Sequence, residues 1–236
     1  MNIAVIFAGG VGRRMNSKAK PKQFLEINGK PIIIHTLEHF ENHPDIDSIC
    51  VVSVPEWMDY LKMLLKKYGL QKVKWIVPGG QTAMESQYNG LTALDNAEKN
   101  IVLLHDGVRP LIDDKTITEC IESVKKFGTA ITVAPATETI MEQSEEGVIS
   151  QIHDRSKCLL ARAPQCFYLD ELLKAHKMAA EEDVQFIDSA SMMLYYGHEM
   201  KTVIGPSENI KVTTPADFYI CRALLSARED SQLYGL

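Results

Sequence analysis

The first residues with an evident chemical role lie in a glycine-rich loop near the N-terminus. Ala8-Gly9-Gly10-Val11-Gly12-Arg13-Arg14-Met15 follows a short apolar run and leads to Lys18, Lys20 and Pro21-Lys22-Gln23. Glycines let backbone N–H groups approach an anion closely, and clustered cations neutralise several phosphate charges together. The loop lacks the GxxxxGK[ST] pattern, and Arg13 stands where a dinucleotide fingerprint has its third glycine. We therefore predict a polyphosphate site that is neither a P-loop nor a dinucleotide fold.

Two further charged residues point to the same chemistry. Asp106 follows the apolar run Ile101–His105, and the carboxyl ends of parallel strands form the edge where α/β proteins bind ligands. A lone carboxylate there suits Mg²⁺, which keeps water ligands and takes phosphate oxygens. We predict Asp106 as the metal ligand, the alternative being a cap for the next turn. Lys211, in an extended Ile-Lys-Val-Thr segment, would be a phosphate contact or an ordinary solvated lysine.

Other residues with metal-binding side chains form weaker patterns. His35, His39 and His43 recur every four residues and would form a stripe on a helix. No glutamate follows His35 as an HExxH motif requires, and Pro44 ends the helix, so we favour an ordinary helix face over a metal site. The five cysteines include no CxxC pair, which argues against a zinc ribbon or a disulfide scaffold.

The elements that must position these residues alternate along the chain. Short β-branched runs separated by longer amphipathic segments predict an α/β fold with a mostly parallel sheet flanked by helices. The expected strands are Ile3–Phe7, Ser48–Val54, Val73–Val77, Ile101–His105, Ala130–Ala134 and Thr202–Ile204. The expected helices are Pro31–Glu41, Glu56–Tyr68, Thr82–Lys99, Asp114–Phe127, Leu169–Glu181, Ser189–Tyr196 and Pro215–Ala227.

The segment from about 137 to 159 does not follow this alternation. It is polar, and Glu145-Glu146-Gly147 reads as a turn between two extended runs. We predict a projecting β-hairpin arm whose apolar residues Ile140, Val148 and Ile149 pack on a second copy of the chain. The alternative is a hairpin folded back on its own domain. Residues 1–236 would otherwise form a single domain.

Composition limits the partners and the location. Hydrophobic residues make up 45% of the 236 residues and charged residues 24%, as in folded globular proteins. The 25 Lys and Arg against 31 Asp and Glu leave a net charge of −6, which argues against nucleic acid or an anionic membrane as a partner. No apolar window approaches a membrane span and no signal peptide is evident, so we expect a cytoplasmic protein.

The combination GGxGxRM followed by Pro-Lys-Gln resembles the cytidylyltransferases that make CDP-methylerythritol and CDP-ribitol, a nucleotidyltransferase branch with a Rossmann-like α/β fold. Further matches follow in the family's order, at Gly79-Gly80, His105–Pro110, Glu138-Thr139-Ile140, Asp154-Arg155, Ala163-Pro164-Gln165, Asp188–Ser191 and Asn209–Thr213. The resemblance covers nearly the whole chain. It implies transfer of CMP from CTP to an alditol phosphate, with Mg²⁺ as the cofactor and pyrophosphate as the leaving group.

The resemblance also implies roles for individual residues. The catalytic residues would be Arg14, Lys22 and Lys211. The nucleotide-binding residues would be Ala8, Gly9, Gly10, Gly12, Gly80, Gln81, Ser86, Asp106 and Gly107. The acceptor-binding residues would be Arg109, Thr139, Arg155 and Asp188. Because this family completes the acceptor pocket across a dimer interface, Thr139 and Arg155 would act from the second subunit's arm and the chain would form a homodimer.

Several positions bear on the choice of substrate. The chain departs from the family's usual Arg, Thr and Thr at Ala83, Ala163 and Ile187. Phe7, Val108 and the run Pro21–Leu25 favour the branch that uses ribitol phosphate. We therefore predict D-ribitol 5-phosphate as the acceptor, with 2-C-methyl-D-erythritol 4-phosphate as the alternative. Two other functions stay open, a related nucleotidyltransferase for another base or a sugar 1-phosphate, and a catalytically inactive nucleotide-binding subunit.

Overall fold

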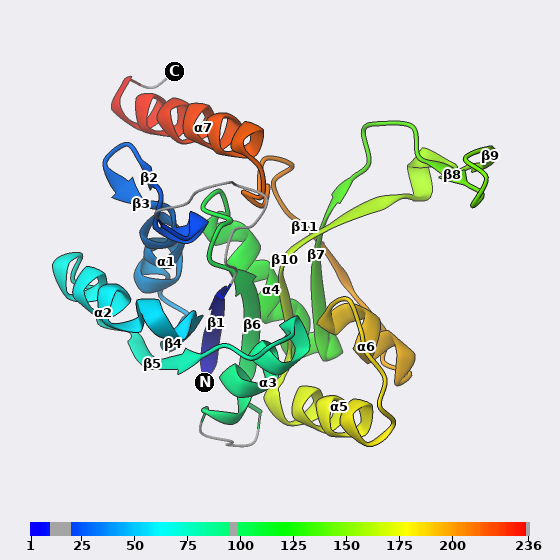
Figure 1. Cartoon of the computed structure of the whole chain (residues 1–236), viewed down its shortest axis with the longest axis horizontal. Helices are drawn as coiled ribbons and strands as arrows, with labels where there is room; N and C mark the ends of the chain where they lie inside the picture. Colours follow the sequence, from blue (N-terminus) through cyan, green and yellow to red (C-terminus); the bar gives the residue numbers. More distant parts are fainter. Residues whose placement is uncertain (10–19, 95–98, 235–236) are drawn as a thin grey trace.

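A seven-stranded sheet forms the centre of the molecule in the computed structural model, which describes residues 1–9, 20–94 and 99–234 (Figure 1). The strand order is β11-β7-β10-β6-β1-β4-β5. The strands are β1 (Asn2–Ala8), β4 (Ser48–Ser53), β5 (Val73–Pro78), β6 (Ile101–Asp106), β7 (Thr129–Pro135), β10 (Leu159–Tyr168) and β11 (Thr202–Ile204). All neighbours pair in parallel except β10, which runs antiparallel to β6 and β7.

Helices cover both faces of this sheet, because its central strands are apolar on both sides. In β1, Ala4 and Ile6 pack into one core with α1 and α4, whereas Ile3 and Val5 pack into the other with α3 and α5. This alternation is expected of a strand buried on both faces. The helices are α1 (Ile32–Asn42), α2 (Met58–Lys67), α3 (Ala83–Thr92), α4 (Asp114–Phe127), α5 (Leu169–Glu181), α6 (Ser189–Tyr195) and α7 (Pro215–Tyr234).

A third, smaller core joins distant parts of the chain beside the sheet. It packs Ile27 and Ile32 against Val108, Val212 and Leu225, all of them buried. These residues belong to the hairpin of β2 (Glu26–Ile27) and β3 (Lys30–Pro31), to the start of α1, to the loop after β6 and to α7. The C-terminal helix thus fixes the segment around residue 212 over the end of β6.

The expected α/β fold is confirmed, and most elements lie where their patterns placed them. Local signals explain several ends: the Asp113 carboxylate caps α4 by accepting from Thr116 N, and Gly128 ends that helix in the left-handed region at φ +84°. Two helix predictions had the wrong length, because α3 ends at Thr92 and α7 continues to Tyr234. Both errors lie at helix ends, where side-chain periodicity is least informative.

One central strand was missed altogether. The sequence analysis expected no strand over β10, although it is the longest strand of the sheet and joins β6 to β7. Pro164 and Arg162 interrupt its apolar pattern, and a proline inside a run argues against a central strand. The structure accommodates both residues in an irregularity, because the pairing with β7 shifts between Ala161 and Gln165.

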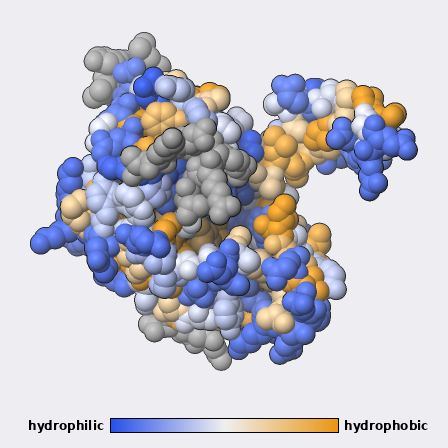
Figure 2. Space-filling model, in the orientation of Figure 1, coloured by the Kyte–Doolittle hydropathy of each residue, from blue (hydrophilic) through white to orange (hydrophobic). Residues whose placement is uncertain are grey.

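The segment expected to be an arm is a hairpin that leaves the body of the molecule (Figures 1 and 2). Strands β8 (Met141–Gln143) and β9 (Ile149–Ile152) pair antiparallel around the predicted turn, and Gly147 takes the left-handed conformation there, at φ +79°. The arm exposes large apolar side chains, with Val148 and Ile152 each 62% accessible. Within the described ranges, no helix combines the length and apolarity needed to cross a bilayer.

Candidate active site

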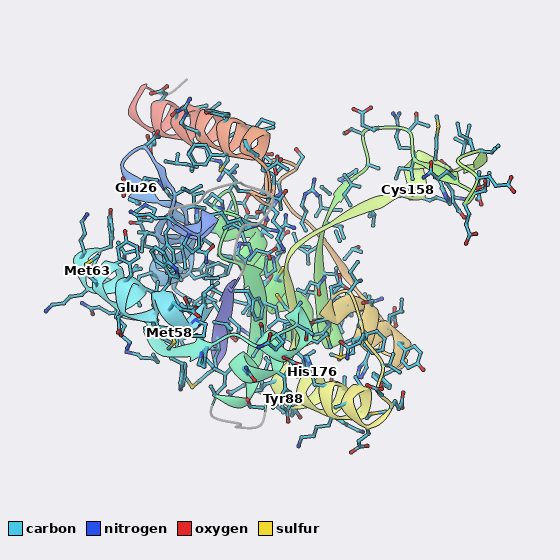
Figure 3. The ribbon with its side chains drawn as sticks, in the orientation of Figure 1. Glu26, Met58, Met63, Tyr88, Cys158 and His176 are labelled. Carbon is cyan, nitrogen blue, oxygen red and sulfur yellow. The ribbon has the colours of Figure 1, made fainter. Side chains whose placement is uncertain are left out.

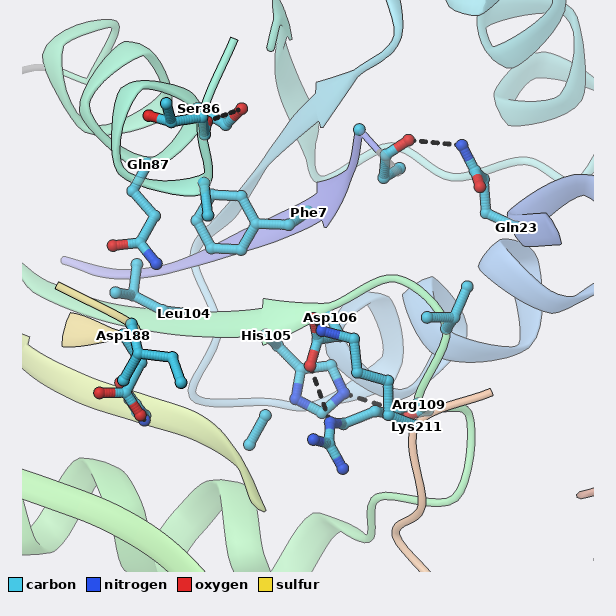
Figure 4. A pocket seen from close by; sticks show the side chains of 18 of the residues that line it. Phe7, Gln23, Ser86, Gln87, Leu104, His105, Asp106, Arg109, Asp188 and Lys211 are labelled. Carbon is cyan, nitrogen blue, oxygen red and sulfur yellow. Dashed lines mark hydrogen bonds and ion pairs between the residues drawn. The ribbon is translucent and has the colours of Figure 1, made fainter. Parts of the chain in front are cut away.

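A cavity of about 570 Å³ opens at the carboxyl ends of β1, β5 and β6 (Figure 4). Parallel strands of an α/β sheet bind ligands at this edge. Ten residues predicted for the site line the cavity, namely Ala8, Gly9, Lys22, Gly80, Gln81, Ser86, Asp106, Arg109, Asp188 and Lys211. The fold therefore brings residues from six separate stretches of the chain to one place.

Asp106 lies at the centre of the charged groups in this cavity. Its Oδ2 accepts from Arg109 Nε at 2.8 Å, and its Oδ1 accepts from Lys211 Nζ at 2.6 Å. Figure 4 shows Arg109 and Lys211 converging on the carboxylate from the loop after β6 and from the C-terminal segment. Burial by itself raises the pKa of Asp106, but the charges of Lys211 and Arg109 and their hydrogen bonds outweigh it and lower the pKa to about 2.

The donor chemistry of Asp106 fits a magnesium ion that is shared with a phosphate ligand. The carboxylate is ionised at neutral pH, and each oxygen keeps a lone pair beyond its bond to a cation. One carboxylate combined with phosphate oxygens and water is a common way for proteins to hold Mg²⁺. Across the described residues, no three His, Cys, Asp or Glu side chains gather as an all-protein metal cage.

Buried contacts hold the basic segment that ends the glycine-rich loop. Gln23 is fully buried and its Nε2 donates to Ala8 O at 2.5 Å, so the end of β1 is tied to residues 22–24. The Lys22 ammonium donates to Val212 O at 3.0 Å, which places it at the edge of the cavity near Lys211. Gly10, Gly12 and Arg14 lie outside the described residues, so their predicted roles stay predictions.

The predicted glycine turn after β5 forms another wall of the cavity. Gly80 N donates to Ser86 Oγ at 3.0 Å, and that hydroxyl in turn donates to Thr82 O. A Cβ on Gly80 would lie 2.4 Å from Glu85 Cβ, so a larger residue has no room there. Thr82 caps α3 by accepting from Glu85 N, and the first turn of this helix therefore faces the cavity.

Two residues of the motif His105–Pro110 hold the loop after β6 through backbone contacts, and His105 also lines the cavity. Gly107 does not line the cavity; its N–H donates to Phe7 O at 2.9 Å, and an added Cβ would lie 3.2 Å from the same oxygen. His105 is buried, its Nε2 donates to Arg109 O at 3.1 Å, and burial lowers its pKa to about 3. The imidazole is therefore neutral and acts as a fixed support for the loop that carries Arg109.

Asp188 reaches the cavity from the start of α6, where its carboxylate already has partners. It accepts from Ser191 N at 2.9 Å as the cap of α6 and from Gln165 Nε2 at 2.8 Å. Gln165 completes the arrangement by accepting from Ala190 N through Oε1. The observed contacts of Asp188 are structural, and its predicted role toward the acceptor stays a prediction.

The structure does not bring Thr139 and Arg155 into this chain's own cavity. Both are exposed on the arm, and Arg155 Nη1 donates to Thr137 O at 2.8 Å. Neither residue lines the cavity described above. An acceptor contact from these residues would therefore require the arm of another molecule.

The histidine stripe (His35, His39 and His43) is a packed face of α1, as we favoured. Each Nε2 donates to a backbone carbonyl, from His35 to Ile27, from His39 to Pro110 and from His43 to Asp114. Burial lowers the pKa values of His35 and His39. The three side chains thus hold neighbouring loops, and in the described part of the chain no three His, Cys, Asp or Glu side chains gather where a metal ion could bind.

Two more groups of reactive side chains lie apart from the cavity. His176 on α5 is buried beside Tyr88 on α3, with ring centroids 5.8 Å apart (Figure 3). Burial lowers the pKa of His176 to about 4. All five cysteines are free thiols; burial raises the pKa of Cys50 to about 12, whereas Cys158 lies at the base of the arm. Nothing in this arrangement pairs a thiol with a catalytic base.

Sequence reasoning gave no role to several residues that shape the site. Asn209 is fully buried. Its backbone carbonyl accepts from Arg109 Nη1 at 2.8 Å, and its side-chain Nδ2 donates to Ala163 O at 2.7 Å. Gln23 and Gln165 hold other walls in similar ways. Each is a polar amide within one of the matched motifs, and its role can be read only when the partner backbone is known.

Comparisons with known proteins agree with this geometry. The model of the IspD family, described as 2-C-methyl-D-erythritol 4-phosphate cytidylyltransferase, matches residues 2–227. A ribitol-5-phosphate cytidylyltransferase of Vibrio parahaemolyticus serotype O3:K6 is 50% identical, and the match covers 100% of both chains. A 2-C-methyl-D-erythritol 4-phosphate cytidylyltransferase of Clostridium acetobutylicum is 39% identical, covering 95% of this chain and 97% of the relative. The crystal structure of 4-diphosphocytidyl-2C-methyl-D-erythritol synthase from Anaerococcus prevotii superimposes with a TM-score of 0.84 at 26% identity, covering 95% and 96% of the two chains.

Proposed function

The chain belongs to the IspD family of cytidylyltransferases, and from this premise we propose that it transfers CMP from CTP to D-ribitol 5-phosphate, giving CDP-ribitol and pyrophosphate. The observation that carries the choice of acceptor is the 50% identity, over the whole length of both chains, to a relative that is named for ribitol 5-phosphate. Relatives named for 2-C-methyl-D-erythritol 4-phosphate are 39%, 37% and 36% identical. We place the reaction in the cytoplasm, as the sequence analysis expected.

The charge distribution of the cavity suits a reaction between two polyanions. Four cations among the described residues line it, namely Lys22, Arg109, Arg162 and Lys211, against the two carboxylates of Asp106 and Asp188. A phosphate oxygen of the acceptor attacks the α-phosphorus of CTP, and the bond from that phosphorus to the bridging oxygen of pyrophosphate breaks. Neutralising and aligning the two reactants supplies most of the catalysis in such a transfer.

We assign the catalytic charges to Lys22 and Lys211, together with Arg14. Lys22 and Lys211 approach the cavity from opposite ends of the sequence, and contacts to Val212 O and to Asp106 hold them there. Both ammonium groups would stabilise the negative charge that grows on the α-phosphate and the leaving group. Asp106 would hold Mg²⁺ together with phosphate oxygens of CTP, and the ion would neutralise charge on the triphosphate.

The nucleotide would lie against the backbone of two loops, after β1 and after β5. Ala8, Gly9 and Gly80 leave the main chain open to a planar base, and Gln81 and Ser86 add polar groups beside it. Ser86 already accepts from Gly80 N, so its hydroxyl has a fixed direction. Backbone amides in a rigid turn select a base by its hydrogen-bonding edge, which supports CTP as the donor.

The acceptor side of the site requires a second copy of the chain in this proposal. Arg109 faces the cavity from its own subunit, whereas Thr139 and Arg155 would arrive on the partner's arm. The exposed apolar residues of the arm, such as Val148 and Ile152, supply a surface for that contact. We therefore propose a homodimer in which each arm completes the other subunit's acceptor pocket.

The decisive experiment measures pyrophosphate release with CTP and Mg²⁺ on two acceptors in parallel. We expect D-ribitol 5-phosphate to give a kcat/KM at least about tenfold above that of 2-C-methyl-D-erythritol 4-phosphate. The second acceptor remains a candidate because the matching family model carries its name. A preference in the opposite direction would contradict the proposed acceptor but not the family. Binding of CTP without release on either acceptor would favour an inactive subunit.

A further inference from the structure

Arg162 is a cavity cation for which the described part of the chain supplies no anionic partner. It lines the cavity from β10, its Nε is buried without a hydrogen-bond partner, and its Nη1 reaches only Ala161 O, at 3.4 Å. Among the described residues, no carboxylate lies within ion-pair distance of this guanidinium.

The backbone holds Arg162 at this place through the irregularity in β10. The pairing with β7 matches Ala161 to Val133 and then Gln165 to Ile131, so residues 162–164 lie opposite a single residue of β7. Asn209 secures this bulge, because its Nδ2 donates to Ala163 O at 2.7 Å. A bulge of this kind redirects a side chain out of the regular alternation.

The same asparagine also positions Arg109, so the two arginines are fixed as a pair. Asn209 is fully buried, and its backbone carbonyl accepts from Arg109 Nη1 at 2.8 Å. Arg109 differs from Arg162 in one respect, because Asp106 neutralises it through Nε at 2.8 Å. Two guanidinium groups therefore face one cavity, and the carboxylate of Asp106 pairs with Arg109 and not with Arg162.

The two guanidinium charges repel each other across the cavity, and an anion bound between them would relieve this repulsion. Burial lowers the pKa of the Arg162 guanidinium, and the positive charge of Arg109 lowers it further. An arginine remains charged in spite of such shifts, so a half-buried guanidinium whose Nε has no hydrogen-bond partner is a site for a planar or tetrahedral anion. Phosphate oxygens match this fork, whereas the hydroxyl groups of a polyol would leave its charge uncompensated.

The place of Arg162 in the sheet separates it from the nucleotide loops. Those loops follow β1 and β5, whereas β10 lies on the other side of β6. We propose that Arg162 binds the phosphate group of the acceptor from within the same subunit, beside Arg109, and so makes the enzyme selective for phosphorylated alditols. This inference rests on the proposed function, because it names a contact to the acceptor of that reaction.

The test compares Arg162→Gln and Arg162→Lys with wild type, in steady-state assays that vary CTP and D-ribitol 5-phosphate separately. We expect Arg162→Gln to raise the KM for D-ribitol 5-phosphate by about 10- to 100-fold, as for a lost charged hydrogen bond, and to change the KM for CTP less than twofold. Arg162→Lys should recover part of the loss, since it keeps the charge but not the fork. Arg222→Gln, on the exposed side of α7, removes the same charge as a control and should match wild type.

A binding measurement keeps the inference separate from the proposed function. Calorimetric titration with D-ribitol 5-phosphate, unphosphorylated ribitol and inorganic phosphate requires no turnover. If wild type releases no pyrophosphate with this acceptor, the proposed function fails, and weaker phosphate binding by Arg162→Gln still supports an anion site at Arg162. An unchanged acceptor KM and unchanged phosphate binding would overturn the inference. A rise in the KM for CTP equal to that for the acceptor would also overturn it, because it would indicate a nucleotide contact or a general structural role.

Discussion

Two groups of polar side chains lie beside the loop after β6, and they differ in the partners that their polar atoms contact. In the Asp106 cluster (Asp106, Arg109 and Lys211), opposite charges face a cavity of about 570 Å³. In the histidine stripe on α1, each imidazole donates to a backbone carbonyl in the packed interior. The histidines recur every four residues and the Asp106 cluster has no such periodicity, yet of these two groups the cluster alone keeps donor and acceptor capacity directed at open space. That remaining capacity marks a site for a ligand.

The strongest test of the comparison removes the central carboxylate. Asp106→Asn should leave Arg109 and Lys211 without their counter-charge and remove the proposed magnesium ligand. We expect kcat/KM for pyrophosphate release to fall by about 10³-fold, equivalent to about 4 kcal/mol of transition-state stabilisation. Near-normal turnover in a folded variant would contradict the role of Asp106.

A smaller loss is expected at the edge of the same cavity. Lys22→Ala removes an ammonium group that Val212 O holds beside the cavity. Loss of one preorganised charge should lower kcat by about 10²-fold, and the KM for the acceptor should change much less. Lys62→Ala, on the exposed surface of α2, serves as the matched control and should keep wild-type turnover. Full activity of Lys22→Ala would remove its catalytic assignment.

Changes in the histidine stripe should affect stability and not turnover. His43 is 1% exposed and its Nε2 lies 3.0 Å from Thr118 Oγ1 and 3.2 Å from Asp114 O. His43→Ala leaves these buried groups unpaired and opens a cavity, so we expect the free energy of unfolding to fall by about 2 kcal/mol. Urea denaturation measures the loss, and His198→Ala on the half-exposed surface should shift it by less than about 0.5 kcal/mol. A dependence of wild-type stability on added zinc would instead favour a metal site.

His176, a buried histidine outside the stripe, should also respond to acid differently from Asp106. His176 has a folded-state pKa of about 4 against an ordinary value of 6.5, so the unfolded chain binds protons that the folded chain does not. Its contribution to stability is complete above pH 6.5 and is lost as the pH falls toward 4. We expect about 1 kcal/mol from this residue between pH 7 and 5.5, and a shallower pH dependence in His176→Gln.

Asp106 loses its contribution to stability in a lower pH range than His176. Its pKa lies at about 2, below the ordinary 3.8, so its stabilising charge is present above pH 3.8 and is lost only as the pH falls toward 2. Thermal melts from pH 7.5 to 5 should therefore report histidines and not the Asp106 cluster. An Asp106→Asn variant whose melting temperature approaches that of wild type between pH 7 and 5 would contradict this separation.

Local patterns in the sequence were sufficient for much of the fold. The β-branched runs predicted β1, β4 and β6, and the amphipathic segment Asp114–Phe127 predicted α4 with the bounds that it has in the structure. These signals act within a few residues, so they can be read without knowing the partners of a segment. The central strand β10 escaped detection because its bulge breaks the alternation and is stabilised only by distant contacts, such as that of Asn209 with Ala163.

The sequence by itself determined which chemistry the protein carries, because a glycine-rich basic loop, a carboxylate at a strand end and the ordered motifs around them have meaning as residue types. The tertiary structure decided which of these groups act together. Lys211 meets Asp106 across about a hundred residues, whereas Thr139 and Arg155 lie on an arm outside their own cavity. Contacts between distant segments also give the imidazoles of the histidine stripe their backbone partners and leave Arg162 without a carboxylate partner among the described residues. Burial and partner geometry are set by contacts between distant segments, and no local pattern contains them.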